Sequence, residues 1–241
     1  MKMLKSGDNM INNYPLKNLF KQFQSIIVID TETSGLDFEK NRVIELAALK
    51  LKVEDNEIVV KNEMDYLIKL PEGVRLDPKI TELTGISEED LDREGVSASF
   101  AFSEFASLFS EEKILLIAYN AHFDLSFLYY SLLRENLCHI LRKIQMLDAL
   151  TVYKDRRAYP HKLENAILEY NLEGKVVNSH RAIDDTKALV EVLKAMDEEN
   201  PDLLKYINLF GYNPKYGVQG LKIGSVKYLP HPYNSPKKLY E

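Results

Sequence analysis

Short apolar runs that end in polar residues divide this chain into segments, and the spacing of apolar positions indicates which element each segment forms. Residues 26–29 and 114–118 are continuous apolar runs of the length expected for buried strands. Residues 43–70 alternate well enough to predict two further strands, joined by a turn at residues 54–57. Other segments predict a short strand near 145–148 and helices near 78–84, 99–110 and 162–170, after Asp124 and after His180. This order predicts an α/β fold with a mixed sheet flanked by helices.

Both ends of the chain depart from this alternating pattern. Residues 1–24 form a lead segment with a short amphipathic stretch at 16–23, and the chain changes character after Pro201. We therefore expect three parts, which are the N-terminal lead segment, a central domain over residues 25–200, and a C-terminal extension over residues 201–241.

The C-terminal extension is basic and rich in tyrosine. Residues 213–241 contain one acid, Glu241, and five lysines, Lys215, Lys222, Lys227, Lys237 and Lys238. Four tyrosines are interleaved with them, Tyr216, Tyr228, Tyr233 and Tyr240. Basic residues mixed with aromatic residues can bind a single nucleic-acid strand through phosphate contacts and base stacking. The alternative, which we favour, is an extended tail that packs its tyrosines on the core and leaves its lysines in water.

Two acids at the end of the first apolar run are the first candidates for chemistry. Asp30 and Glu32 lie two residues apart, and because strand side chains alternate between faces they project to the same side. Two like charges about 4 Å apart repel by roughly 4 kcal/mol at an effective dielectric constant near 20. A buried pair therefore needs a cation, most naturally a divalent metal, whereas on a surface strand both groups would simply be solvated.

Further acids follow the second apolar run and begin the last predicted helix. Asp124 falls in or near the first turn of a helix with an apolar face. His180 precedes Asp185 by five residues, and positions five apart on a helix point about 140° from each other. His180 must therefore lie on the preceding loop, from which it can fold over the site. As alternatives, Asp124, Asp184 and Asp185 could only complement helix dipoles, and His180 could be a solvated or capping residue.

These three segments, in this order, resemble the three motifs of the DEDDh exonucleases, the DnaQ-like 3′-5′ family that includes the proofreading exonuclease of bacterial DNA polymerase III. The residues that match the motifs are Asp30 and Glu32 in the first, Asp124 in the second, and His180 and Asp185 in the third. Minor signatures match at residues 42–46, at residues 83–86 and at Asp148. The resemblance covers residues 24–197 and implies a ribonuclease H-like fold with a C-terminal extension.

The resemblance also implies a phosphodiester hydrolase that uses two divalent cations, Mg²⁺ or Mn²⁺, because both the attacking and the leaving oxygen need charge neutralisation. Asp30 is expected to bridge the two ions, Glu32 and Asp185 to complete the first, and Asp124 to hold the second. His180 is expected to act as general base on the attacking water. Attack at the terminal phosphodiester would release nucleoside 5′-monophosphates from a 3′ end.

Three more residues are candidates for substrate binding by the same resemblance. Leu36 and Phe127 match family positions whose apolar side chains pack on the terminal bases, although both could instead be core residues. The backbone around Thr33 is expected to contact the terminal 3′ hydroxyl. The expected partners are single-stranded or frayed 3′ ends of nucleic acid, with a DNA polymerase as a further candidate.

Composition agrees with a cytoplasmic enzyme. Cys138 is the single cysteine, so an internal disulfide is excluded. No apolar run approaches the roughly 18 residues of a membrane span, and no membrane association or signal peptide is expected. The net charge of −6 is unusual for a duplex-binding protein, but an enzyme that grips a few terminal nucleotides needs few phosphate contacts.

Two rivals to a DNA exonuclease stay open. One is an exoribonuclease or an oligonucleotide-trimming enzyme, because the same site cleaves both sugars and discrimination rests on contacts to the 2′ hydroxyl. The other is a non-catalytic module of the same fold that binds nucleic acid or a polymerase, which the intact set of five motif residues opposes.

Overall fold

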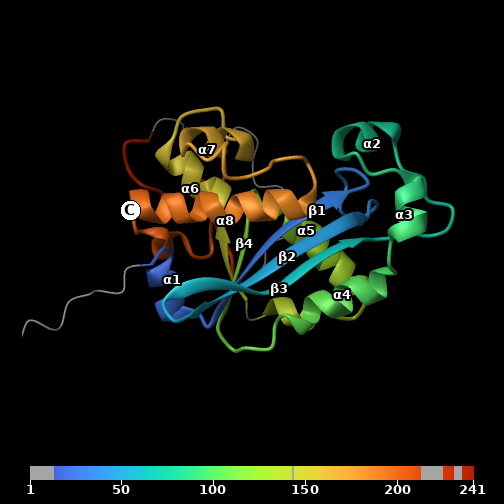
Figure 1. The fold of residues 1–241 in the computed structure, drawn as a ribbon, viewed down its shortest axis with the longest axis horizontal. Helices are drawn as coiled ribbons and strands as arrows, with labels where there is room; N and C mark the ends of the chain where they lie inside the picture. Colours follow the sequence, from blue (N-terminus) through green and yellow to red (C-terminus); the bar gives the residue numbers. More distant parts are fainter. Residues whose placement is uncertain (1–13, 143, 213–224, 231–234) are drawn as a thin grey trace, which may run out of the picture.

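A mixed sheet of five strands forms the centre of the protein, in the order β3-β2-β1-β4-β5 (Figure 1). The structure is a computed structural model that describes residues 14–142, 144–212, 225–230 and 235–241. The strands of this sheet are β1 (Ser25–Thr33), β2 (Val43–Glu54), β3 (Glu57–Leu67), β4 (Ile114–Ala118) and β5 (Gln145–Asp148). β1 pairs antiparallel with β2 and β2 antiparallel with β3, whereas β4 pairs parallel with both β1 and β5. The predicted mixed sheet is therefore confirmed.

Local sequence explains the first three strands. Asp55 and Asn56 have φ angles of 49° and 66°, and a two-residue turn with both φ angles positive matches the twist of a hairpin. β2 is buried over most of its length because it lies between two strands, whereas the edge strand β3 is largely exposed and correspondingly polar. The turn predicted at residues 54–57 is confirmed.

Helices cover both faces of the sheet. They are α1 (Lys17–Gln22), α2 (Pro78–Thr84), α3 (Glu88–Glu94), α4 (Ala98–Ser107), α5 (Ala121–Arg134), α6 (Ala149–Arg156), α7 (Leu163–Glu169) and α8 (Ala182–Glu199). Short 3-10 helices span Cys138–Arg142 and Leu203–Tyr206. In the described part of the chain, no helix combines the length and apolarity that crossing a bilayer requires.

Two of these helices, α3 and α6, were missed by the sequence analysis. α3 has a single buried residue, Leu91, and depends on a capping box between Ser87 and Asp90 rather than on an apolar stripe. α6 begins directly after β5, with Asp148 as its N-cap, so that no polar break separates strand from helix. Short helices of this kind leave almost no periodic signal.

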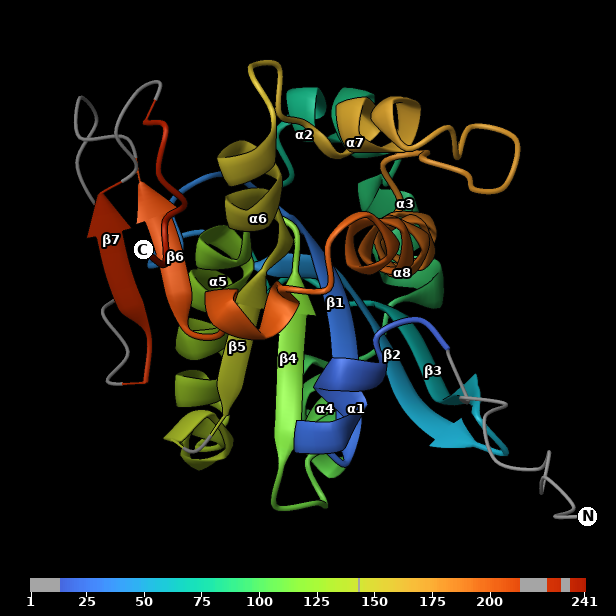
Figure 2. The same ribbon diagram turned by 90° about the vertical axis from the view of Figure 1, so that its left-hand side faces the viewer.

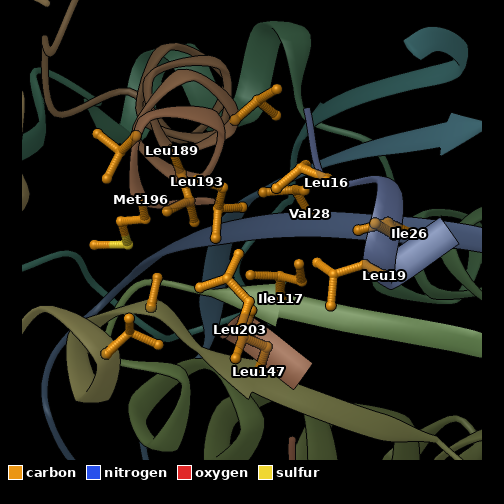
Figure 3. Close-up of a cluster of buried hydrophobic side chains, with 14 of the residues drawn as sticks. Leu16, Leu19, Ile26, Val28, Ile117, Leu147, Leu189, Leu193, Met196 and Leu203 are labelled. Atoms are coloured by element: carbon orange, nitrogen blue, oxygen red, sulfur yellow. The ribbon is translucent and has the colours of Figure 1, made fainter. Parts of the chain in front are cut away.

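The alternation of β1 divides the interior into two hydrophobic clusters. Ile26 and Val28 face one cluster with α1, α6, α7 and α8, while Ile27 and Ile29 face the other with α4 and α5. Figure 3 shows the first cluster, in which Leu189, Leu193 and Met196 of α8 lie over β1 and β4. Because β1 is buried on both faces, its position relative to the helices is well determined where the first two acids emerge.

The predicted lead segment and extension both contribute to this core. Leu16 and Leu19 are fully buried around α1, and Leu203 and Tyr206 are buried after α8. β6 (Leu209–Tyr212) and β7 (Lys227–Pro230) form a parallel pair beyond β5 (Figure 2). The three-part division of the chain remains a prediction.

Where the extension is described, its tyrosines pack on the core as the favoured interpretation expects, but Lys238 bonds to the core instead of lying in water. The Tyr240 hydroxyl donates to Asp202 at 2.7 Å, and its ring lies edge-on against Tyr206 with centroids 5.0 Å apart. Tyr228 packs edge-on against Phe210 at 5.5 Å. Lys238 donates to the carbonyl of Asp155 at 2.9 Å. Lys215, Tyr216, Lys222 and Tyr233 lie outside the described residues.

Deleting residues 235–241 should lower the melting temperature without changing nucleic-acid binding. The Tyr206–Tyr240 ring pair contributes about 0.5–1.5 kcal/mol beyond its burial, and each lost hydrogen bond about 1 kcal/mol. At about 2–4 °C per kcal/mol for a domain of this size, the loss should be several degrees. Thermal unfolding and the salt dependence of oligonucleotide binding measure the two effects. An unchanged melting temperature with a shallower salt dependence would favour strand binding by the tail.

Candidate active site

Three carboxylates from two elements meet at the C-terminal end of the central strand β1. Asp30 and Glu32 lie on the face of β1 that α8 covers, and Asp185 lies in the first turn of α8. One oxygen of each of the three residues lies within 4.8 Å of the others. Oxygen ligands about 2.0–2.6 Å from a common cation are at most about 5 Å apart, so the arrangement fits a single divalent ion.

Asp124 approaches the same strand from the other face of the sheet. Its side chain is 2% exposed, and its Oδ1 accepts a hydrogen bond from Thr31 Oγ1 at 2.8 Å. Thr31 lies between Asp30 and Glu32 and points away from them. Asp124 is thus adjacent to the three-carboxylate group without belonging to it.

The electrostatics of the group call for a cation. Burial raises the pKa of Glu32 to about 8, that of Asp124 to about 7 and that of Asp185 to about 6. Burial also raises the pKa of Asp30 well above its ordinary value, and the charges of Asp124, Glu32 and Asp185 add to the effect. Hard divalent cations prefer oxygen donors, so these residues fit Mg²⁺ or Mn²⁺ better than a softer metal.

The loop before α8 places His180 beside this group. α8 begins at Ala182, so His180 lies outside the helix as the spacing predicted, and its φ of 56° turns the backbone sharply. The charge of His180 acts on Asp185, whose pKa it lowers against the larger effect of burial. Asp184 is directed elsewhere, since its Oδ2 accepts from Ser179 Oγ at 2.5 Å. Of the two adjacent acids, Asp185 is therefore the one in the carboxylate group.

A buried glutamate that the sequence analysis did not single out fixes the start of α8. Glu45 is 0% exposed and accepts from Arg181 Nε at 2.9 Å, from Arg181 Nη2 at 2.6 Å and from the backbone N–H of Ala182 at 2.9 Å. It pairs with Glu32 across β1 and β2. An acid inside the apolar run 43–49 was the available signal, because a buried acid must have partners.

Asp148 plays a comparable part for α5. It is 5% exposed and accepts from the backbone N–H of Ala121 at 3.0 Å, from that of Leu150 at 3.2 Å and from Thr151 Oγ1 at 2.6 Å. One carboxylate thus ties together the starts of α5 and α6. It holds the turn from which Asp124 projects.

The predicted substrate-binding residues fall in different environments. Leu36 is 83% exposed on the loop after β1, where an apolar side chain is available to a ligand. Thr33 is buried, and its hydroxyl donates to the carbonyl of Gly35 at 2.7 Å. Phe127 is 1% exposed and packs against Phe123 and Phe38. The ring of Phe127 thus lies in the core of this structure, and its packing on a base stays a prediction.

Comparison with known sequences identifies related proteins. The family model RNase_T, which describes an exonuclease, matches residues 27–193. The PolC-type DNA polymerase III of Clostridium perfringens is 29% identical over 196 residues, covering 79% of this chain and 12% of that protein. Ribonuclease T of Histophilus somni is 32% identical over 120 residues, covering 46% of this chain and 55% of that protein. The chain therefore spans only part of the length of these relatives.

Solved structures show the same fold. A structure of exonuclease I matches with a TM-score of 0.67 at 20% identity, covering 76% of this chain and 43% of that one. The complex of E. coli exonuclease I with a dA16 oligonucleotide matches with a TM-score of 0.63 at 18% identity, covering 76% and 42%.

The strand order, together with acids at the end of the central strand, defines a nuclease of the ribonuclease H-like fold. Because the family model covers most of its length, the chain belongs to the RNase_T exonuclease family. The resemblance to the DnaQ-like 3′-5′ exonucleases is thereby confirmed.

We expect Glu45→Gln to lower kcat by roughly 10²-fold, with little change in KM, because a 1 Å displacement of catalytic groups can cost that much. The substitution places an amide N–H₂ against Arg181 or the Ala182 N–H and so loosens the start of α8. The exposed pair Glu63–Lys187, at 2.7 Å, also joins α8 to the sheet, so Glu63→Gln is the matched control and should retain activity. Equal activities of the two variants, measured well below their melting temperatures, would contradict this role of Glu45.

The raised pKa values predict how stability depends on pH. At these carboxyls the folded protein retains protons that the unfolded chain releases above about pH 4, so their contribution to stability is fully present below that pH. It should be lost as the pH rises through the pKa of Asp185, about 6, and that of Glu32, about 8. We expect the melting temperature of the metal-free protein to fall over this interval and Mg²⁺ or Mn²⁺ to restore it, most strongly at the alkaline end.

The control for this titration is the variant Asp30→Asn/Glu32→Gln, which removes two of the charges at nearly constant volume. Its melting temperature should respond much less to pH and to added metal. A wild-type melting temperature that is flat over the same interval and indifferent to metal would show that the carboxylates are already compensated.

Proposed function

We propose that this chain is a metal-dependent 3′-5′ exonuclease that removes nucleoside 5′-monophosphates from single-stranded or frayed 3′ ends of DNA. The observation that carries the proposal is the convergence of Asp30, Glu32 and Asp185 within 4.8 Å, beside Asp124 and His180. The family membership and the relatives' names support the reaction class. A cytoplasmic location belongs to the same proposal.

Each residue has a chemical task in this reaction. When bound, two divalent cations, Mg²⁺ or Mn²⁺, supply neutralisation of charge on the attacking and leaving oxygens of the phosphodiester. Asp30 would hold both ions, Glu32 and Asp185 would complete the first site, and Asp124 would hold the second in place of its hydrogen bond from Thr31. His180 removes the proton of the attacking water, and its place on a loop lets it approach from outside the sheet.

Substrate contacts follow from the loop after β1. Leu36 presents an exposed apolar side chain on which a terminal base packs, and the backbone around Thr33 is placed to contact the terminal 3′ hydroxyl. Relatives that align over most of this chain include PolC-type DNA polymerase III, and E. coli exonuclease I has been solved with a DNA oligonucleotide. These names favour DNA as substrate and make a DNA polymerase a candidate partner.

RNA is the second candidate substrate, favoured by the similarity to ribonuclease T. The experiment that tests the proposal compares end-labelled single-stranded DNA, duplex DNA with a mismatched 3′ end, and RNA of the same sequence, with Mg²⁺ or Mn²⁺. Shortening from the 3′ end with release of 5′-monophosphates is expected, fastest on single-stranded DNA. Full activity in excess chelator, or none on any substrate, would overturn the proposal.

Asp30→Asn should nearly abolish hydrolysis, and His180→Ala should lower kcat by roughly 10²- to 10⁴-fold with substrate affinity little changed. Asp184→Asn is the control, because Asp184 bonds Ser179 instead of joining the carboxylate group, and its effect should be mild. An active His180→Ala enzyme would assign the general base to another group. Single-turnover rates measured with saturating enzyme separate these effects from binding.

A further inference from the structure

A positively charged pocket lies near the end of β1, as the carboxylates do, but on the face of the sheet that α4 and α5 cover. Its volume is about 200 Å³, and it is formed by the start of β2, the end of β3, α4 and the second half of α5. Arg42, Lys69 and Arg134 line it, against one acid, Glu135. Three positive charges against one negative charge depart clearly from a chain whose net charge is −6.

The two arginines contact the same turn through backbone carbonyls, and Arg134 also lies over the Tyr130 ring at 5.9 Å from its centroid. Arg42 Nη1 donates to the carbonyls of Lys40 and Asn41 at 2.6 and 2.9 Å, and Arg134 Nη2 donates to the carbonyl of Glu39 at 2.6 Å. The carboxylate of Glu39 is engaged by the Tyr130 hydroxyl at 2.8 Å. Among the ion pairs of the described residues, none involves either guanidinium.

Repulsion between the two guanidinium groups favours an anionic ligand between them. Burial and the charge of Arg42 both lower the pKa of Arg134, so the two guanidinium groups lie near enough to repel each other. A guanidinium presents a planar fork of N–H donors that matches the oxygens of a phosphate. A phosphate between Arg42 and Arg134 would replace that repulsion by two sets of charge-assisted hydrogen bonds.

The size and walls of the pocket suit one group of a larger ligand. At about 200 Å³ it is smaller than the roughly 300–1,000 Å³ of pockets that enclose a whole small molecule. Buried apolar side chains of Val43, Ile68 and Phe102 form its lining beside the cations. A phosphate can lie against the arginines while the attached sugar meets the apolar wall.

The pocket is joined to the carboxylates by short stretches of chain. The Ser34 N–H donates to the Arg42 carbonyl at 2.8 Å, and the Arg42 N–H donates to Ser34 Oγ at 2.9 Å, so Arg42 is fixed beside the end of β1. Along α5, Arg134 is ten residues beyond Asp124, which is about 15 Å at 1.5 Å per residue. Figure 1 shows α4 and α5 on one side of the sheet near the end at which β1 terminates.

We propose that Arg42, Arg134 and Lys69 bind a backbone phosphate of the nucleic-acid strand, a few nucleotides upstream of the phosphodiester that is hydrolysed. The inference rests on the proposed exonuclease function. A strand whose 3′ end lies at Asp30 passes the exposed Leu36 and the turn at 39–41 before it reaches this pocket. The contact is made to phosphate and not to a base, so it is independent of sequence.

The test variant is Arg42→Gln/Arg134→Gln, which removes both charges and keeps N–H donors for the carbonyls of the turn. Its matched control is Arg75→Gln/Arg93→Gln, which removes the same charge from two exposed arginines that pair with acids elsewhere. Both are compared with the unaltered protein on a dinucleotide, which has no upstream phosphate, and on a hexanucleotide. Oligonucleotide binding without metal is measured as a function of salt.

For the unaltered protein and the control, kcat/KM should rise from the dinucleotide to the hexanucleotide. In the pocket variant, kcat/KM on the hexanucleotide should fall by roughly 10-fold, while kcat/KM on the dinucleotide should stay within about twofold. The slope of the logarithm of the binding constant against the logarithm of salt concentration should decrease by about 0.7 for one lost phosphate contact. Arg42→Lys/Arg134→Lys keeps the charge and should retain most of the slope, which separates charge from folding. Equal hexanucleotide rates and equal slopes in the pocket variant and the control would overturn the proposal.

The same experiment distinguishes failure of the proposed exonuclease function from failure of the phosphate-binding proposal. If the unaltered protein hydrolyses neither substrate, the function is wrong, and the salt slopes alone decide the pocket. A lower slope in the pocket variant than in the control then supports phosphate binding there, and equal slopes refute it.

Discussion

Burial of like charge at the end of β1 is the constraint on which the rest of the structure depends. Asp30, Glu32 and Asp185 lie within 4.8 Å of one another, and burial is the largest cause of the raised pKa of each. Two such groups about 4 Å apart repel by roughly 4 kcal/mol when both are ionised, at an effective dielectric constant near 20, which favours protonation or a bound cation. Arg181, which lowers the pKa of Glu32, already gives its hydrogen bonds to Glu45. The arrangement is therefore held by the surrounding packing and completed by a ligand of positive charge.

The packing that opposes this repulsion begins in the same strand. Ile26, Ile27, Val28 and Ile29 are all fully buried, two on each face of the sheet, and burying such a side chain contributes about 1.5–3 kcal/mol. The acids thus follow the segment of the chain that is least able to move. A surface strand would let Asp30 and Glu32 relax into water, and the affinity for a cation would decrease with the repulsion.

Particular residues show how far sequence reasoning reaches in this protein. The pairing of Asp30 and Glu32 was predicted because strand alternation is a local and periodic property, whereas the choice of Asp185 over Asp184 rested on the resemblance to the exonuclease motifs. Glu45 was missed as a contributor to the site because its partners, Arg181 and Ala182, are distant in sequence and come together only through the packing of α8 on β2. The sequence left open whether Phe127 faces a ligand or the core, because this depends on the element opposite the helix, here the loop that carries Phe38.

At the end of β1, the two faces of the sheet carry side chains of different chemistry. The α8 face holds Asp30, Glu32 and Asp185, with Glu45 fixing the start of the helix, while the α5 face holds Asp124, aromatic side chains and arginines. The loop after β1 connects them, because Phe38 stacks on Tyr130 at 5.3 Å and Arg134 bonds the Glu39 carbonyl. Carboxylates bind cations and arginines bind phosphate, and their separation keeps the two kinds of side chain from pairing with each other instead of with ligands. A polyanion can thus be held by arginines at one point while its terminal phosphodiester lies among carboxylates that would otherwise repel it.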